Sequence, residues 1–281
     1  LVLLVTDASA QEVKPKPVFQ NFTVDEGLLS NEVYHIIQDS IGYMWIATEN
    51  GINRFNGVDF QDYTIDDGLV DNTIYEIYGD RKGRLWFISN RGALVYFEHD
   101  TINLYPFNTK ITDRFTVTRG PIKKSFLIDS LENVHVSFKR YGRFTIGTDG
   151  ACEKLAEEYD EGVVVMEKTR DGTILISTPL EPQTKNFIYI DKAKNQKYAI
   201  DYRELSHART QVYNIYCIAE SDDSFLMAVY GAVYRVKNGE IVQKKSFGEE
   251  IIWMSMDNDG NLWVAPIEGG VYCFANANFM M

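Results

Sequence analysis

An internal repeat with an offset of 41 residues constrains the fold of this chain more than any other feature. Residues 27–55 align with residues 68–96 without a gap, and nine of the 29 aligned positions are identical. A third, shorter copy spans residues 257–269. Repeats of about 40 residues are typical of folds in which each repeat is one supersecondary unit that packs on its neighbours. The residues that recur are Asp39, Asp80 and Asp257, Gly42, Gly83 and Gly260, Trp45, Trp86 and Trp263, and Gly51, Gly92 and Gly269.

Each strong repeat is predicted to form four antiparallel strands. In the first repeat, apolar runs over residues 33–38 and 44–48 flank the turn Asp39-Ser-Ile-Gly42, and strands over 52–55 and 60–64 follow. Glycine supplies the positive φ of such a turn, and aspartate accepts hydrogen bonds from the turn amides. Apolar and polar residues alternate only weakly, as expected where both faces of a sheet are covered by neighbours.

Weaker copies of the repeat fill the middle of the chain. They cover residues 127–138, 163–177 and 212–234, and they place His135 and Leu175 where the other repeats have tryptophan. Six repeats are therefore visible, and aromatic residues, which favour strands, make up 13% of the chain. Four-stranded units repeated around a centre form β-propellers. The sequence thus predicts an all-β fold, a β-propeller of four-stranded antiparallel blades.

The ends of the repeat array bear on how the ring closes. Residues 19–23 resemble an outer strand with no blade before it, whereas residues 279–281 resemble the start of an outer strand for the last repeat. Residues 19–23 could pair with residues 270–274 and close a six-bladed ring, or a missing seventh blade could separate the two segments. The strand that starts after residue 274 favours the second alternative. We therefore expect a truncated seven-bladed ring with an incomplete last blade.

Residues 1–10 are interpreted as the remnant of a secretory signal peptide, because an apolar run precedes the A-x-A cleavage pattern Ala8-Ser-Ala10. Residues 11–17 are predicted to form an extended spacer, which leaves residues 18–281 for the propeller. No other stretch approaches the roughly 18–20 apolar residues that a membrane-spanning helix needs. We expect a periplasmic or extracellular location, with any membrane anchor outside this sequence.

The pattern G-L-x-x-N-x-[VI]-Y-x-I-x-x-D-x-x-G-x-[ML]-W-[IF]-x-[TS]-x-x-G resembles the two-component regulator propeller repeat. The resemblance is strong over residues 19–107 and 251–274 and diffuse over 108–250. It implies the extracytoplasmic, ligand-sensing region of a bacterial sensor histidine kinase, classical or hybrid. In the full receptor, a transmembrane and kinase region absent from this chain would receive the signal. The resemblance further implies a small-molecule or carbohydrate ligand and a homodimeric receptor.

Composition and motifs argue against several other classes of function. A net charge of −12 disfavours nucleic acid and anionic membranes as partners. No P-loop or kinase ATP-binding motif occurs, so we expect no cofactor and no catalytic residue. An exported propeller enzyme acting on glycans, such as a lyase or a sialidase-like hydrolase, stays open as the alternative. The histidines, His35, His99, His135 and His207, show neither metal-ligand spacing nor an adjacent nucleophile.

The repeated residues are interpreted as structural. The tryptophans are expected to pack between blades. Asp257-Asn-Asp-Gly260 is similar to a calcium loop, but its glycine stands at the fourth position instead of the sixth, so we expect a turn and no metal. The lysine pairs 123–124 and 244–245 are expected to be solvated strand edges. Cys152, Cys217 and Cys273 are too few and too scattered for a disulfide framework or a zinc site.

The turns that follow the tryptophan strands are predicted to carry the ligand site. These turns should emerge on one face of the ring, and their side chains differ between repeats, whereas the Asp-x-x-Gly turns of the opposite face repeat. Variation on a repeated framework is where specificity can be encoded, and loops over the end of a channel are common binding sites. The candidate residues are Glu49, Asn50, Asn90, Arg91, Tyr230 and Glu268.

Overall fold

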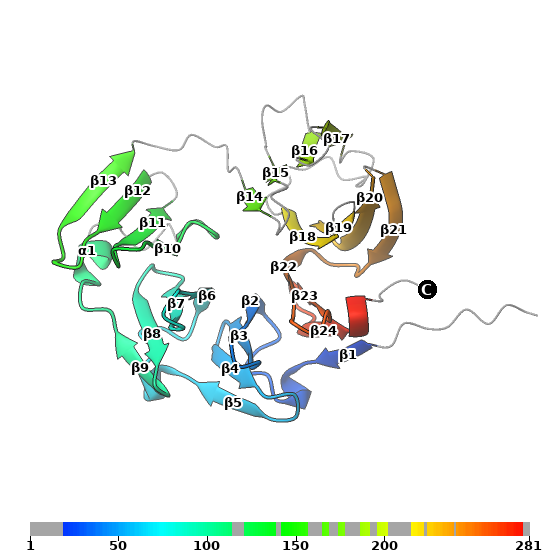
Figure 1. Cartoon of the computed structure of the whole chain (residues 1–281). Helices are drawn as coiled ribbons and strands as arrows, with labels where there is room; N and C mark the ends of the chain where they lie inside the picture. Colours follow the sequence, from blue (N-terminus) through cyan, green and yellow to red (C-terminus); the bar gives the residue numbers. More distant parts are fainter. Residues whose placement is uncertain are drawn as a thin grey trace, which may run out of the picture.

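Six four-stranded antiparallel sheets surround a common centre in the computed structural model of the chain (Figure 1). This arrangement confirms the predicted β-propeller of four-stranded blades. The residues predicted as signal remnant and spacer, and residues 279–281, lie outside the part of the chain that the structure describes. The described residues are 19–113, 121–138, 142–156, 165–168, 174–177, 186–191, 196–201, 215–221, 224–238 and 240–277.

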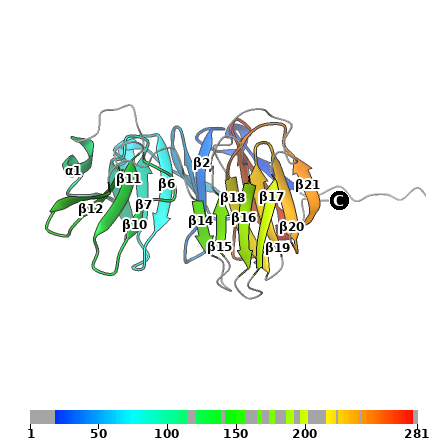
Figure 2. The ribbon, with the colours of Figure 1, turned by 90° about the horizontal axis from the view of Figure 1, so that it is seen from above.

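Five of the sheets are meanders of consecutive strands, and the first strand of each lies nearest the centre (Figure 1). Seen from above, the strands lie roughly parallel to the axis of the ring, and neighbouring strands point in opposite directions (Figure 2). The strands of these sheets are β2 (Val33–Gln38), β3 (Met44–Thr48), β4 (Gly51–Phe55) and β5 (Phe60–Tyr63); β6 (Ile74–Gly79), β7 (Leu85–Ser89), β8 (Leu94–Glu98) and β9 (Thr101–Leu104); β10 (Leu127–Ile128), β11 (Val134–Phe138), β12 (Gly142–Ile146) and β13 (Cys152–Ala156); β14 (Val165–Lys168), β15 (Ile174–Ser177), β16 (Asn186–Asp191) and β17 (Gln196–Asp201); and β18 (Ile215–Ser221), β19 (Ser224–Val229), β20 (Ala232–Lys237) and β21 (Glu240–Ser246).

The sixth sheet joins the two ends of the described chain. Its strands are β22 (Ile251–Met256), β23 (Leu262–Pro266), β24 (Val271–Phe274) and, at the outer edge, β1 (Phe19–Phe22). Strand β1 pairs antiparallel with β24, from Phe19 opposite Phe274 to Phe22 opposite Val271. The expectation of a missing seventh blade between these segments is therefore wrong. Strand β1 fills the outer edge of the β22–β24 sheet, which a new outer strand would otherwise have taken. The other predicted alternative, closure by residues 19–23, is the one observed.

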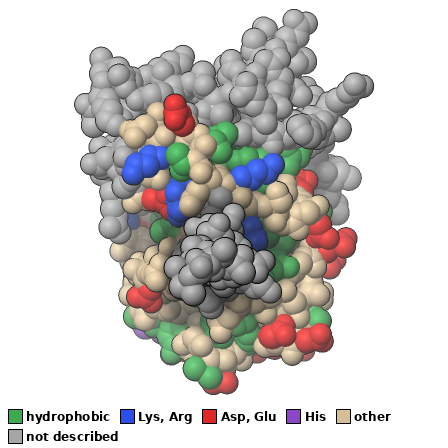
Figure 3. Space-filling model, turned by 90° about the vertical axis from the view of Figure 1, so that its right-hand side faces the viewer, with side chains coloured by type: hydrophobic (Ala, Val, Ile, Leu, Met, Phe, Trp, Pro, Cys, Tyr) green, Lys and Arg blue, Asp and Glu red, His purple; other side chains and the backbone are tan. Residues whose placement is uncertain are grey.

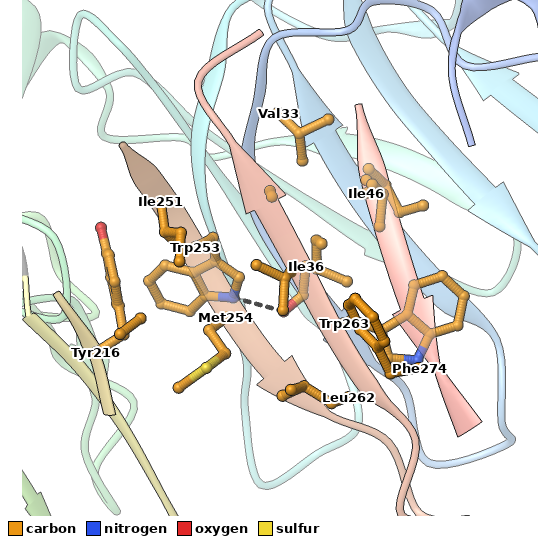
Figure 4. Close-up of a cluster of buried hydrophobic side chains, with 14 of the residues drawn as sticks. Val33, Ile36, Ile46, Tyr216, Ile251, Trp253, Met254, Leu262, Trp263 and Phe274 are labelled. Carbon is orange, nitrogen blue, oxygen red and sulfur yellow. Dashed lines mark hydrogen bonds between the residues drawn. The ribbon is translucent and has the colours of Figure 1, made fainter. Parts of the chain in front are cut away.

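Buried apolar side chains hold neighbouring sheets together. One cluster joins the β22–β24 sheet to β2–β4 and to β18–β20, as Figure 4 shows for Trp253, Ile36 and Tyr216. A second joins the β2–β5 and β6–β9 sheets around Trp45, and a third joins β6–β9 to β10–β12 around Trp86. Trp45, Trp86 and Trp263 have exposed fractions of 0%, 3% and 4%, so the predicted packing of these tryptophans between blades is confirmed.

The gap-free offset of 41 residues does not hold beyond the tryptophan strands. Two residues separate the paired residues Thr48 and Gly51 at the end of β3, but three separate Ser89 and Ala93 at the end of β7, where the amide of Ser89 donates to the oxygen of Ala93. Phe55 therefore corresponds in space to Phe97, one residue beyond the sequence alignment. The last repeat also has a longer turn. Gly270 there takes the place of Gly51, with φ +70°, so the assignment of that role to Gly269 was wrong.

Helical structure is sparse in the described residues. It comprises α1 (Thr109–Thr112) and three short 3-10 helices, η1 (Val24–Glu26), η2 (Ile65–Asp67) and η3 (Ala275–Ala277). None of these helices is long and apolar enough to cross a membrane. On the side of the molecule that Figure 3 shows, apolar, acidic and basic side chains are interspersed around the grey residues.

Candidate functional site

A hydrogen bond between aspartate and tryptophan fastens each strong blade. The indole Nε1 atoms of Trp45, Trp86 and Trp263 donate to Oδ2 of the aspartate six residues earlier, at 2.8, 2.9 and 2.9 Å. The other carboxylate oxygen accepts two turn amides, for example those of Ile41 and Tyr43 at Asp39. Both oxygens of each aspartate are thus engaged, which supports the interpretation of these residues as turn structure. The constant Asp-to-Trp spacing was a sequence signal for this bond.

The third blade keeps this device with different residues. His135 occupies the tryptophan position, as predicted, and its Nε2 lies 3.1 Å from Oδ2 of Asp129. Glu132 stands where the other turns have glycine and adopts the same left-handed backbone, with φ +66°. Hydrogen bonds from the amides of Leu131 and Asn133 to Asp129 Oδ1 reproduce the turn. The replacement of tryptophan and glycine makes this repeat hard to recognise in the sequence, whereas the retained hydrogen bonds keep its geometry.

The six residues predicted to bind a ligand lie in the turns that follow the second strand of four sheets. Glu49, Asn50, Asn90, Arg91 and Glu268 are exposed, and Tyr230 is half-buried. Two of these side chains contact residues that precede the first strand of their own sheet. The amide of Asn50 donates to the carbonyl of Leu29 at 3.3 Å, and Arg91 lies 3.8 Å from Asp71. Their role in binding stays a prediction.

A second group of polar side chains, absent from the prediction, lies where the inner strands of several sheets converge. Strands β2, β6 and β22 each carry a β-bulge at the same position of the repeat, between Val33 and His35, Ile74 and Glu76, and Ile251 and Trp253. A bulge re-aims the side chains beside it and is common near functional sites. Here the bulges bring equivalent residues of three adjacent blades together: His35, Glu76 and Trp253.

Two lysines enter this group from the segment that precedes β10, which points toward the centre of the ring in Figure 1. The Nζ atom of Lys123 donates to the carbonyl of Tyr34 at 2.8 Å, and the backbone N–H of Lys124 donates to Glu76 Oε1 at 2.9 Å. The Nζ atom of Lys124 lies 5.3 Å from the Trp253 ring centroid. We call His35, Glu76, Lys123, Lys124 and Trp253 the axial cluster.

Burial governs the electrostatics of the axial cluster. His35, Glu76 and Trp253 have exposed fractions of 4–6%. Burial raises the pKa of Glu76 to about 7, and burial lowers the pKa of Lys123 to about 7 although Glu76 opposes that shift. Burial also holds the pKa of His35 well below its usual value, with the nearby charges of both lysines adding to the effect. The pKa values of this carboxyl and this amine thus lie close together, near neutral pH.

The axial cluster overturns one expectation and leaves another in place. Lys123 and Lys124 lie in a turn and not on a strand edge, and Lys123 is half-buried against the ring of Tyr75. Lys124 is solvent-exposed, as expected, although its Nζ atom also lies near the ring of Tyr216. Lys244 and Lys245 do lie on the outer strand β21, as predicted. The sequence offered one signal for the cluster, because His35 and Glu76 are polar residues inside a strand of the repeat that is otherwise apolar.

In the described ranges, no group of three or more histidine, cysteine, aspartate or glutamate side chains is placed to hold a metal ion. The three cysteines are free thiols in different sheets. Burial raises the pKa of Cys273 to about 12, so this thiol is a poor nucleophile.

The ring of four-stranded blades defines the class, a β-propeller. Within that class, residues 27–50 and 68–91 match the family described as "Two component regulator propeller", which confirms the resemblance recognised in the repeat. "Histidine kinase P4" of Formosa agariphila is 44% identical over 43 residues, which are 15% of this chain and 3% of that protein.

Solved structures share the fold at low sequence identity. The extracellular domain of a hybrid two component system from B. thetaiotaomicron superposes with a TM-score of 0.64 and 16% identity, over 92% of this chain and 42% of that one. A streptogramin B lyase superposes with a TM-score of 0.54 and 11% identity, over 91% of this chain and 96% of that one. The chain thus spans less than half of the extracellular domain it resembles, and these likenesses establish the fold alone.

Proposed function

We propose that this chain is an extracytoplasmic sensor propeller of a two-component histidine kinase and is not itself an enzyme. The observation that carries this proposal is the match of two consecutive repeats to the two-component regulator propeller family. The short similarity to a histidine kinase and the shared fold of an extracellular two-component domain support it. A lyase has the same fold, so the fold by itself does not decide between sensor and enzyme.

The proposed ligand is a small molecule or carbohydrate that binds over the face carrying Glu49, Asn50, Asn90 and Arg91. Side chains on this face are mostly exposed and belong to turns anchored on rigid strands, which suits a binding surface. Binding would transmit a signal by favouring one arrangement of two paired receptor domains over another. The ligand must then discriminate between the two arrangements, and allosteric couplings are typically about 1–3 kcal/mol.

Thermal-shift screening of the purified chain against carbohydrates and small metabolites tests whether it binds a ligand. A ligand that raises the melting temperature is then added to membranes containing the full-length parent, and autophosphorylation of the kinase is measured. We expect a ligand-dependent change in phosphorylation and recovery of the ligand unaltered. Chemical conversion of the ligand by the purified chain would instead favour the glycan-active enzyme.

The position of the site is tested with two matched triple variants. Replacing Asn50, Arg91 and Glu268 with alanine should abolish the ligand response. The control replaces Asn258, Arg81 and Asp259, which are the same or similar residue types, exposed in the Asp-x-x-Gly turns of the opposite face. A response lost in the control and retained in the first variant would show that the opposite face binds the ligand.

A further inference from the structure

The ammonium group of Lys123 lies inside a cage of aromatic rings. Its Nζ atom is 4.6 Å from the ring centroid of Tyr75, 5.5 Å from that of Trp253 and 5.9 Å from that of Tyr34. A cation within about 6 Å of such ring faces is attracted by their quadrupoles, most strongly where water is excluded. The rings belong to β2, β6 and β22, so three different sheets build the cage.

Two polar atoms beside the cage have no hydrogen-bond partner. Oε2 of Glu76 and Nδ1 of His35 are both buried and unpaired. Burying an unpaired polar atom is costly, and such atoms commonly mark a functional site or a missing bound group. Glu76 uses only Oε1, which accepts the amide of Lys124. Oε2 of Glu76 is therefore available as an acceptor beside the cage, because Lys123, which now occupies the cage, makes no hydrogen bond to it.

The lysine that fills the cage comes from a sheet that does not build it. Residues 121–125 are fastened to β11, where the amide of Ile122 donates to the carbonyl of Ser137 at 2.8 Å. Lys124 adopts a left-handed backbone with φ +61°, which is strained for a residue other than glycine and is a feature of ligand-holding segments. Withdrawal of Lys123 would break its bond to Tyr34 but no strand pairing of β2, β6 or β22.

We propose that the cage of Tyr34, Tyr75 and Trp253, with Glu76 beside it, is a binding site for a small organic ammonium ion that displaces Lys123. The aromatic faces and the Tyr34 carbonyl would hold the cation as they hold the lysine, and the free oxygen of Glu76 would accept a further N–H bond. This site differs from the predicted ligand face. It does not depend on the proposed sensor function, because binding of the ammonium ion can be measured on the purified chain without the kinase.

The test probe is n-propylammonium, which matches the end of a lysine side chain, with 1-propanol as its neutral analogue. Binding is followed by tryptophan fluorescence. The fluorescence change that is lost in Trp253→Phe is assigned to the tryptophan of the cage. We expect saturable binding of n-propylammonium by the wild-type chain and none of 1-propanol. Lys123→Ala removes the competitor and should bind on the order of tenfold more tightly. Lys123→Met removes the charge but fills the space, so it should bind neither probe.

Two further variants complete the test. Glu76→Gln keeps the shape of the side chain and should weaken binding on the order of tenfold, because a desolvated charge partner is lost. Lys110→Ala removes an exposed lysine of α1 and should bind as the wild type does. Equal binding of 1-propanol and n-propylammonium would overturn the proposal. Binding of n-propylammonium by Lys123→Ala but not by the wild type would also overturn it, because Lys123 would then occupy the cage permanently as a structural residue. If Lys123→Ala does not fold, absence of a saturable response in the wild type is sufficient to reject the site.

Discussion

Replacement of Trp45 by alanine should be among the most damaging single changes in this propeller. The indole is fully buried and lies 4.8 Å from the Phe97 ring, 5.5 Å from Tyr63 and 5.6 Å from Phe87, measured between ring centroids. Removing a large aromatic side chain from a core costs about 3–5 kcal/mol, because contacts are lost and a cavity forms. At roughly 2–4 °C per kcal/mol for a domain near this size, the melting temperature should fall by roughly 6–20 °C.

Trp45→Phe separates packing from the hydrogen bond. Phenylalanine keeps most ring contacts but leaves Oδ2 of Asp39 without the indole donor, and a hydrogen bond to a charged group contributes about 1.5–3 kcal/mol. Urea denaturation followed by far-UV circular dichroism measures both variants, with Val58→Ala as the control because Val58 is 82% exposed. The reasoning is refuted if Trp45→Ala unfolds at the wild-type urea concentration. A loss as large for phenylalanine as for alanine would show that the bond, and not the packing, dominates.

Three further perturbations follow from the structure. Burial raises the pKa of Glu76 from 4.5 to about 7, so this side chain ionises first in the unfolded chain and contributes a loss of up to about 3 kcal/mol as pH rises between these values, whereas buried His35 contributes with the opposite sign below its usual pKa. Glu76→Gln should flatten that part of the pH profile of unfolding free energy, and an unchanged slope would exclude Glu76 as its origin. Phe22→Ala should cost about 2 kcal/mol and speed proteolysis of the first strand, since its half-buried ring stacks on Trp263 at 5.8 Å; unaltered cleavage would mean that this ring does not hold the strand. Gly42→Ala should cost about 1–2 kcal/mol from its positive φ alone, and Gly51→Ala more, because its Cβ would also lie 2.5 Å from a backbone oxygen. Equal melting temperatures for the two glycine variants would contradict this steric argument.

Local sequence was sufficient to predict the blades because the repeat encodes them locally. Asp39, Gly42 and Trp45 lie within seven residues of one another and make one turn and one hydrogen bond. The same logic identified His135, whose ring nitrogen can bond to an aspartate as an indole does. The one-residue difference between the turns after Trp45 and Trp86 was not predictable, since identical glycines aligned across it by chance.

The axial cluster could not be predicted in the same way because its contacts are not local. Lys123 is far from Tyr34, Tyr75 and Trp253 along the chain, and only closure of the ring brings their sheets together. Nothing in the residues that flank Lys123 distinguishes a caged lysine from one on a strand edge. Ring closure was likewise decided by pairing between the two ends, where a short apolar segment suited either alternative.

The pairing of β1 with β24 has a consequence for the order in which the molecule folds. The blades of β2–β5 and β6–β9 can form from hairpins whose strands are close in sequence, which is fast. Strand β1 precedes them in synthesis, yet its partner β24 is made only after the strands of the other five sheets. During that interval β1 and the open edge of the ring are both exposed to unwanted pairing with other chains. Among the described strands, the first to be made is thus the last that can pair, and we expect the yield of folded protein to fall as this interval lengthens.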